Sequence, residues 1–258
     1  MKHINVINFS GGRTSAYMTK RLLEETDEEY LITFQNTGRE SKETLDFINE
    51  CDKKWNLNIL WLEYRKPSVN ENRFEVVTYE TASRNGEPFT QLIEQRPASI
   101  PNLQFRYCTT QLKIKTLKRY LKKQGIKDYT SFNGIRYDEP KRWSKASDSD
   151  FDVDLPLVKW KVTKEDVREF WNQQEFDLQL EQPFGNCDGC FLKGKGKLLE
   201  ILAKDINALD WWIEIEETNI KKVQFKKEIT YRQLKELAMK GENKFTDDPS
   251  FSCFCNAD

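Results

Sequence analysis

The first residues that could carry out chemistry form a short loop near the N-terminus, residues 10–15 (SGGRTS). A β-prone apolar run precedes this loop, and a helical pattern of apolar residues follows it. Glycines let backbone N–H groups turn towards an anion, and the first turn of a helix adds its own unpaired N–H groups. The loop hydroxyls and the guanidinium of Arg13 supply further donors. The spacing therefore predicts a phosphate-binding loop, with a plain connecting turn as the alternative.

Cysteines form the second group of reactive residues. The chain has six cysteines and a single histidine, His3. One histidine excludes metal sites that need two and leaves almost no room for histidine acid/base chemistry. Cys187-Asp188-Gly189-Cys190 puts two thiols on one tight turn, a spacing that suits a metal, a cluster or a redox dithiol. Lysines follow this turn at once and are expected to lower the thiol pKa values. Cys51 lies on the apolar side of its predicted helix and is expected in the core.

The elements that must position these residues alternate between strand and helix. Strands are predicted over residues 4–9, 30–34 and 58–64, with helices over 14–25 and 41–55 between them. Short connections in this order require parallel strands. The fold class is therefore α/β, a doubly wound and mostly parallel, Rossmann-like sheet.

Beyond residue 64 the pattern loosens as far as residue 105, where prolines interrupt it. Residues 136–142 are predicted as a polar loop and residues 241–258 as an irregular tail. Thr163 is a predicted N-cap, and Thr230 with Gln233 predicts a capping box. The remaining predicted elements are helices over 108–123, 163–170, 197–209 and 230–239, and strands over 128–135 and 155–160.

Composition limits the class of protein. No apolar run approaches the roughly 18 residues of a membrane span, and the N-terminus does not have the pattern of a signal peptide, so we expect a cytoplasmic protein without a membrane. The net charge is −1, but residues 106–127 hold eight Lys/Arg and no Asp/Glu. We expect two regions: residues 1–180 as a nucleotide-binding α/β domain, and residues 181–258 as a cysteine-containing helical region packed on it.

Four motifs resemble motifs of the phosphoadenosine phosphosulfate (PAPS) reductase family of the PP-loop adenine nucleotide α-hydrolase superfamily, and they occur in the same order as in that family. Together they span residues 4–160. They are the loop 10–15, which resembles Ser-Gly-Gly-x-Asp-Ser; Asn36-Thr37-Gly38 with Glu43-Thr44; the segment from Arg106 to Lys113; and the segment from Gly134 to Glu139.

The resemblance implies an enzyme of sulfur chemistry that binds an adenine nucleotide, either ATP or a sulfonucleotide such as PAPS. Thr14 stands where typical ATP-cleaving members have Asp. The Gly-Gly pair favours ATP, whereas the family pattern favours a reductase. PAPS reductases end in a Glu-Cys-Gly-Leu-His motif, and this chain has Cys253 and Cys255 near its end instead, so both are predicted as catalytic nucleophiles.

Cluster-bearing relatives use an early Cys-Cys pair and a later C-x-x-C to bind a [4Fe-4S] cluster. Cys108 matches the second cysteine of the early pair, and Tyr107 occupies the first. The resemblance therefore implies Cys108, Cys187 and Cys190 as metal ligands, with Cys255 or Cys253 as a fourth. Zinc on four cysteines and unligated thiols are the alternatives, and three protein ligands with an open iron site are another.

The same resemblance places Lys113 beside the substrate, as a catalytic residue. Two activities fit: thiolate attack on a sulfonucleotide with a thiol reductant, or ATP cleavage that activates a tRNA or DNA for sulfur insertion from a sulfur donor. In the second case the basic segment 106–127 would contact the nucleic acid. A non-catalytic nucleotide-binding subunit with structural zinc is a third hypothesis, and a homodimer is left open. The predicted nucleotide-binding residues are Ser10, Gly11, Gly12, Arg13, Thr14, Ser15, Thr37, Gly38, Glu43, Gly134, Arg136 and Arg142.

Overall fold

A single sheet organises the protein, which we describe from a computed structural model over residues 3–147, 152–180, 184–185 and 187–242. Within these residues the strand order is β4-β3-β2-β1-β5-β6. Neighbouring strands run parallel except β3 and β4, which are antiparallel. The strands are β1 (Ile4–Asn8), β2 (Tyr30–Asn36), β3 (Leu60–Tyr64), β4 (Phe74–Val77), β5 (Tyr129–Asn133) and β6 (Val153–Asp154).

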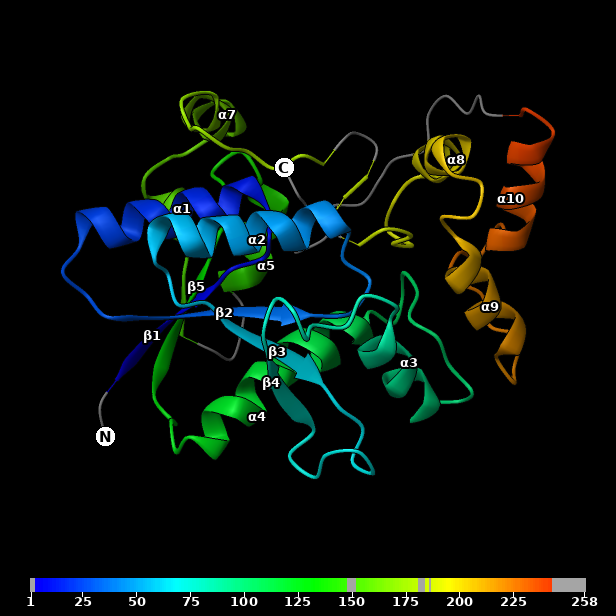
Figure 1. The fold of residues 1–258 in the computed structure, drawn as a ribbon, viewed down its shortest axis with the longest axis horizontal. Helices are drawn as coiled ribbons and strands as arrows, with labels where there is room; N and C mark the ends of the chain where they lie inside the picture. Colours follow the sequence, from blue (N-terminus) through cyan, green and yellow to red (C-terminus); the bar gives the residue numbers. More distant parts are fainter. Residues whose placement is uncertain (1–2, 148–151, 181–183, 186, 243–258) are drawn as a thin grey trace.

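Helices cover both faces of the sheet (Figure 1), as the alternation of strands and helices predicts. Helices α1 (Arg13–Glu25) and α2 (Lys42–Trp55) lie on one face, and α4 (Lys115–Lys123) lies on the other. Ile7 of β1 belongs to the core under α1 and α2, whereas Val6 packs with Leu117 of α4. Adjacent residues of one strand thus enter opposite layers. The doubly wound α/β fold is confirmed.

Three helices gather beyond the β3 side of the sheet (Figure 1): α8 (Lys195–Lys204), α9 (Asp210–Thr218) and α10 (Tyr231–Met239). Their apolar residues share one core with Tyr64, Phe89 and Leu112. Both predicted caps are confirmed, because Thr230 forms a capping box on α10 and Thr163 forms one on α7 (Lys164–Asn172). The division at residue 180 stays a prediction.

The prediction of a strand over residues 155–160 is wrong. Residues 156–159 form the short helix α6 (Pro156–Lys159), and the neighbouring strand β6 ends at Asp154. Pro156 has no N–H for a strand ladder and its fixed φ suits the first turn of a helix. The apolar run Leu155-Pro156-Leu157-Val158 looked like a buried strand, and the proline decides against it.

Other elements have different bounds from those predicted, or were not predicted. The loosely patterned segment 65–105 contains β4 and α3 (Glu87–Glu94), and the polar loop 136–142 runs into α5 (Pro140–Ser147). The helix predicted over 108–123 begins as a π-helix, η1 (Thr109–Ile114), and continues as α4. Helix α8 ends at Lys204 rather than residue 209, and α9 follows it. None of the described helices combines the length and apolarity that a membrane span needs.

Candidate nucleotide site

The loop of residues 10–15 connects β1 to α1 and is closed by its own hydrogen bonds. The backbone N–H of Ser10 donates to Ser15 Oγ at 3.1 Å, and Ser15 Oγ donates to the carbonyl of Gly12 at 2.9 Å. Gly11 has φ +82°, and a Cβ there would lie 2.7 Å from Cγ2 of Thr44. Only glycine fits this turn without strain. The predicted loop between strand and helix is therefore present, with the N-terminus of α1 behind it.

The guanidinium of Arg13 contacts the segment that follows α7. Its Nε and Nη2 donate to the two carboxylate oxygens of Asp177 at 2.6 and 2.8 Å, and Nη2 also donates to the carbonyl of Leu178 at 2.8 Å. Such a forked pair is among the stronger hydrogen-bonded contacts of a protein. In this structure Arg13 therefore fastens α1 to the segment after α7.

We expect Arg13→Ala to lower the free energy of unfolding by about 1–2 kcal/mol, because it removes this partly exposed forked pair. Nucleotide affinity should change less than threefold. Urea denaturation and a binding titration measure the two effects, and Asp177→Asn is the matched control for the pair. A loss of affinity for Arg13→Ala without the same loss for Asp177→Asn would contradict this assignment and return Arg13 to the phosphate site.

A cavity of about 260 Å³ lies next to the loop, between the sheet and the η1–α4 segment. It sits where β1 and β5 are neighbours and the strand order turns back, the usual ligand position of an open α/β sheet. Four residues predicted from the sequence meet in its wall although they come from three distant segments. They are Ser10, Lys113, Gly134 and Arg142.

Polar side chains of three neighbouring strands form the floor of this cavity, and the sequence analysis missed them. Asn8 donates through Nδ2 to Ser131 Oγ at 2.7 Å and to Asn133 Oδ1 at 3.0 Å. Gln35 of β2 lines the same cavity. Asn8 follows Val6 by two residues and Ser131 follows Tyr129 by two, and both apolar residues pack on the α4 side of the sheet, a periodicity that could have revealed these two polar residues. Phe9, Ile114, Leu117 and Ile135 add apolar surface.

The π-helix η1 brings Thr109, Lys113 and Ile114 to the cavity wall. π-helical turns are rare and often occur at functional sites. Lys113 is mostly buried and its Nζ lies 3.5 Å from Oε1 of Glu40, whose side chain is 1% exposed. The other oxygen of Glu40 accepts from the N–H and the hydroxyl of Thr37 at 2.8 and 2.9 Å. Glu40 thus links the predicted Thr37 turn to Lys113, and the sequence analysis did not single it out.

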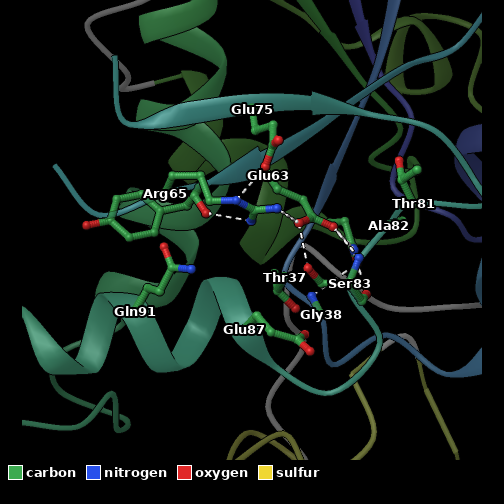
Figure 2. Close-up of polar contacts among 12 residues, drawn as sticks. Thr37, Gly38, Glu63, Arg65, Glu75, Thr81, Ala82, Ser83, Glu87 and Gln91 are labelled. Atoms are coloured by element: carbon green, nitrogen blue, oxygen red, sulfur yellow. Dashed lines mark hydrogen bonds and ion pairs between the residues drawn. The ribbon is translucent and has the colours of Figure 1, made fainter. Parts of the chain in front are cut away.

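A buried carboxylate, Glu63 on β3, holds the start of the same turn (Figure 2). It accepts hydrogen bonds from Asn36 Nδ2 at 2.6 Å and from Ser83, and it pairs with Arg65 at 2.7 Å. Asn36 in turn accepts from the N–H of Gly38 at 3.1 Å. Thr37 and Gly38 are therefore placed by a polar network below them. Glu43 lies apart, exposed in the first turn of α2.

Arg136 and Arg142 lie on the segment that follows β5. Arg136 is 6% exposed, and its Nη1 donates to Thr14 Oγ1 at 3.2 Å while its Nε donates to Asp138 at 3.0 Å. Arg142 lines the cavity and pairs with Glu139. The structure thus joins Thr14 of the phosphate loop to the arginine-bearing loop, two regions that are 122 residues apart.

Three cysteines lie against one core. Cys108 precedes η1, and Cys108, Cys187 and Cys190 all pack on the cluster that includes Leu112 and Trp212. Among the described residues, no three Cys, His, Asp or Glu side chains form a group that could hold a metal ion. Cys253 and Cys255 lie outside the described residues. Cys51 is fully buried in the first core, as predicted.

The lysines near the C-x-x-C loop were expected to lower the pKa of its thiols, but at Cys187 other effects outweigh them. Burial raises the pKa of the Cys187 thiol well above its usual value, and the carboxylates of Glu40 and Asp188 raise this pKa further. Lys193 and Lys113 lower it only in part. At neutral pH the Cys187 side chain is therefore a thiol in the absence of a bound group.

The C-x-x-C loop is fastened directly to the Thr37 turn. Cys187 forms an antiparallel bridge with Glu40, Asp188 pairs with Arg39, and Asp188 N donates to the carbonyl of Arg39 at 3.1 Å. Trp212 donates through Nε1 to Asp188 at 2.8 Å. The loop therefore contacts the segment that follows Thr37 through backbone as well as side-chain interactions.

Gly189→Ala should lower the free energy of unfolding by about 2–3 kcal/mol, because a Cβ would lie 2.3 Å from Nε1 of the buried Trp212. Thermal or urea denaturation measures this change. Gly125→Ala is the control for a glycine whose Cβ would meet no atom within 4 Å, although its φ of +75° adds a strain that Gly189 does not have. Equal stability of Gly189→Ala and the wild type would show that Trp212 does not pack on this loop.

The fold and the cavity define a nucleotide-binding α/β protein whose phosphate loop follows its first strand. Residues 4–179 match the phosphoadenosine phosphosulfate reductase domain family, so the chain belongs to this family and to the PP-loop adenine nucleotide α-hydrolase superfamily. Members of the family are generally enzymes.

Two relatives are themselves uncharacterized. A nin region protein of Escherichia phage lambda is 32% identical over 205 residues, which cover 76% of this chain and 68% of the phage protein. A protein of Methanocaldococcus jannaschii is 26% identical over 163 residues, which cover 60% of this chain and 33% of the archaeal protein. This chain thus matches about a third of the archaeal protein.

Proposed function

We propose that this protein is an enzyme that binds an adenine nucleotide in the cavity beside residues 10–15. The observation that carries the proposal is the meeting of Ser10, Lys113, Gly134 and Arg142 in one cavity wall. Apolar side chains and strand amides suit the adenosine part, while the loop N–H groups, Lys113 and Arg142 suit the phosphates. The nucleotide-binding residues of the proposal are those predicted from the sequence. Of these, Ser10, Gly134 and Arg142 line the cavity. Arg13 and Glu43 have the weakest support, because Asp177 holds the Arg13 guanidinium and Glu43 is exposed on α2.

The reaction we propose is the sulfur chemistry of the PAPS-reductase-like family. In its first form the thiolate of Cys253 or Cys255 attacks the sulfur of a bound sulfonucleotide, and the S–O bond breaks so that the nucleotide phosphate leaves. A thiol reductant then displaces sulfite from the cysteine and forms a disulfide. Its second form is cleavage of ATP between the α- and β-phosphates, which activates a nucleic acid for sulfur insertion. One observation supports the second form: within the described residues, Lys115, Lys122, Lys123 and Lys127 of the basic segment form no ion pair.

The proposal includes a [4Fe-4S] cluster, or zinc, bound by Cys108, Cys187, Cys190 and Cys255. It assigns this group no step in either reaction. The shared core of three of these cysteines supports it, but the described side chains do not form a metal-binding group, so neither reaction above uses one. Iron, sulfide and zinc analysis after anaerobic purification tests it. A brown protein whose absorbance near 400 nm disappears in Cys187→Ala supports the cluster. A colourless protein with stoichiometric zinc supports zinc.

Titration with ATP, GTP and PAPS, followed by product assays, tests the proposal. We expect binding of ATP or PAPS, no comparable binding of GTP, and either pyrophosphate from ATP or thiol-dependent sulfite from PAPS. Binding without either product would favour a non-catalytic nucleotide-binding subunit. No binding of either adenine nucleotide would overturn the proposal.

A further inference from the structure

Two arginines lie close to the same tyrosine ring, on the side of α4 that faces β3 and β4. The guanidinium carbon of Arg73 lies 5.9 Å from the ring centroid of Tyr64, and that of Arg119 lies 5.8 Å from it. Arg73 donates to the Tyr64 hydroxyl at 3.5 Å, and Arg119 donates to Gln111 Oε1 at 3.3 Å. Two positive charges thus share one aromatic side chain.

Neither guanidinium forms an ion pair within the part of the chain that the structure describes. Nε of Arg73 and Nη1 of Arg119 are buried and have no hydrogen-bond partner among the described residues. The carboxylates of the two adjacent strands, Glu63 of β3 and Glu75 of β4, both pair with Arg65. This arrangement differs from Arg13, whose donors are taken up by Asp177 and Leu178.

Two guanidinium groups placed near each other and partly buried destabilise the fold unless a negative charge offsets them. Burial lowers the pKa of Arg119, and the nearby charge of Arg73 lowers this pKa further. Buried donors without acceptors add their own desolvation cost. A bound oxyanion would lower this cost, because its charge offsets the two guanidinium groups and its oxygens accept N–H bonds from the partly exposed side of each.

The pair is separate from the nucleotide cavity. The cavity lies over β2, β1, β5 and β6 and is lined on its other side by Ile114, Leu117 and Lys118. Arg119 instead contacts Tyr64 of β3, and the next residue, Tyr120, packs against Phe74 of β4. Arg73, Arg119 and Tyr64 are not among the residues that line the cavity, although Arg119 and part of the cavity wall share α4.

We propose that Arg73 and Arg119 form a second anion site, which binds a phosphate group. This site does not depend on the proposed nucleotide function. Two sources supply the same chemistry, a free phosphate dianion or a phosphodiester of a nucleic acid backbone. The experiment below distinguishes them, because a free phosphate saturates the site by itself, whereas a backbone phosphate binds tightly only as part of a polymer.

The test compares thermal denaturation in phosphate with that in chloride at equal ionic strength, and adds binding of a labelled single-stranded oligonucleotide. Arg119→Gln and Arg73→Asn remove one guanidinium each. Arg73 has φ +61°, a conformation that asparagine adopts more readily than most residues, so Arg73→Asn preserves the turn. Lys53→Gln is a control for loss of one exposed charge, from α2 and outside the basic segment, and Lys113→Gln weakens the nucleotide cavity.

We expect phosphate to raise the denaturation midpoint of the wild type, of Lys53→Gln and of Lys113→Gln. The apparent phosphate affinity of Arg119→Gln and of Arg73→Asn should be about tenfold weaker. If phosphate has little effect and the oligonucleotide binds about tenfold more weakly to the same two variants, the source is a nucleic acid. The proposal is overturned if Lys113→Gln alone loses the response, if Lys53→Gln loses it equally, or if neither anion binds.

Discussion

Lys113→Met should weaken adenine-nucleotide binding by about 100-fold, equivalent to about 2.7 kcal/mol. Lys113 lines the cavity and lies 3.5 Å from the buried carboxylate of Glu40. Its removal therefore has two effects. A charged donor to the nucleotide phosphates is lost, and the Glu40 charge is left facing an anionic ligand. Isothermal titration with ATP and with PAPS measures the change.

A double variant separates these two effects. Lys113→Met with Glu40→Gln removes the cation and its neighbouring charge together, so binding should recover part of the loss, in the manner of a double-mutant cycle. Lys115→Met removes a lysine two residues along that does not line the cavity, and its affinity should match that of the wild type. Wild-type affinity for Lys113→Met would show that the nucleotide does not reach η1.

The sequence predicts the nucleotide half of the protein well because its signals are local. Residues 4–64 alternate between short apolar runs and amphipathic helices, and each predicted strand and helix is found there within a few residues. The Gly11 turn is set by a conformation that few residues other than glycine adopt. Apolar composition alone gave a wrong prediction of a strand at residues 155–160, where Pro156 starts a helix.

The floor of the cavity and the network below the Thr37 turn were not predicted. Asn8, Gln35 and Asn133 have no common spacing in the sequence, and they become neighbours only because β1, β2 and β5 are adjacent in the sheet. Glu63 looked like an ordinary polar residue in a strand, but its charge lies on a fully buried position. Strand order is a tertiary property, so these groups follow from the fold rather than from any motif.

The cysteine loop shows the same dependence on tertiary contacts. Its spacing indicated two thiols on a turn, but its contacts with Arg39, Glu40 and Trp212 come from segments that are 24 or more residues away. These contacts bury Cys187 and surround it with carboxylates. A count of nearby lysines therefore gave the wrong direction for the pKa of Cys187.

Glu63→Ala should cause the largest loss of stability among these substitutions, about 3–5 kcal/mol, because it leaves buried partners without their acceptor. Glu63 is 0% exposed, and its carboxylate accepts from Asn36, from the N–H and hydroxyl of Ser83, and from Arg65 (Figure 2). A loss of this size is a large part of the 5–15 kcal/mol that stabilises a typical domain. Urea denaturation measures it.

Glu75→Ala is the matched control, because Glu75 pairs with the same arginine, at 2.6 Å, from an exposed position. An exposed pair is worth about 1 kcal/mol or less, so the difference between the two variants isolates the cost of the buried donors. Glu63→Ala should also weaken nucleotide binding, since Asn36 holds the N–H of Gly38 and hence the Thr37 turn beside Glu40 and Lys113. If the two variants are equally stable, Glu63 is hydrated and the turn is held by its own hydrogen bonds. If Glu63→Ala is unstable but binds nucleotide normally when folded, the network supports the fold alone.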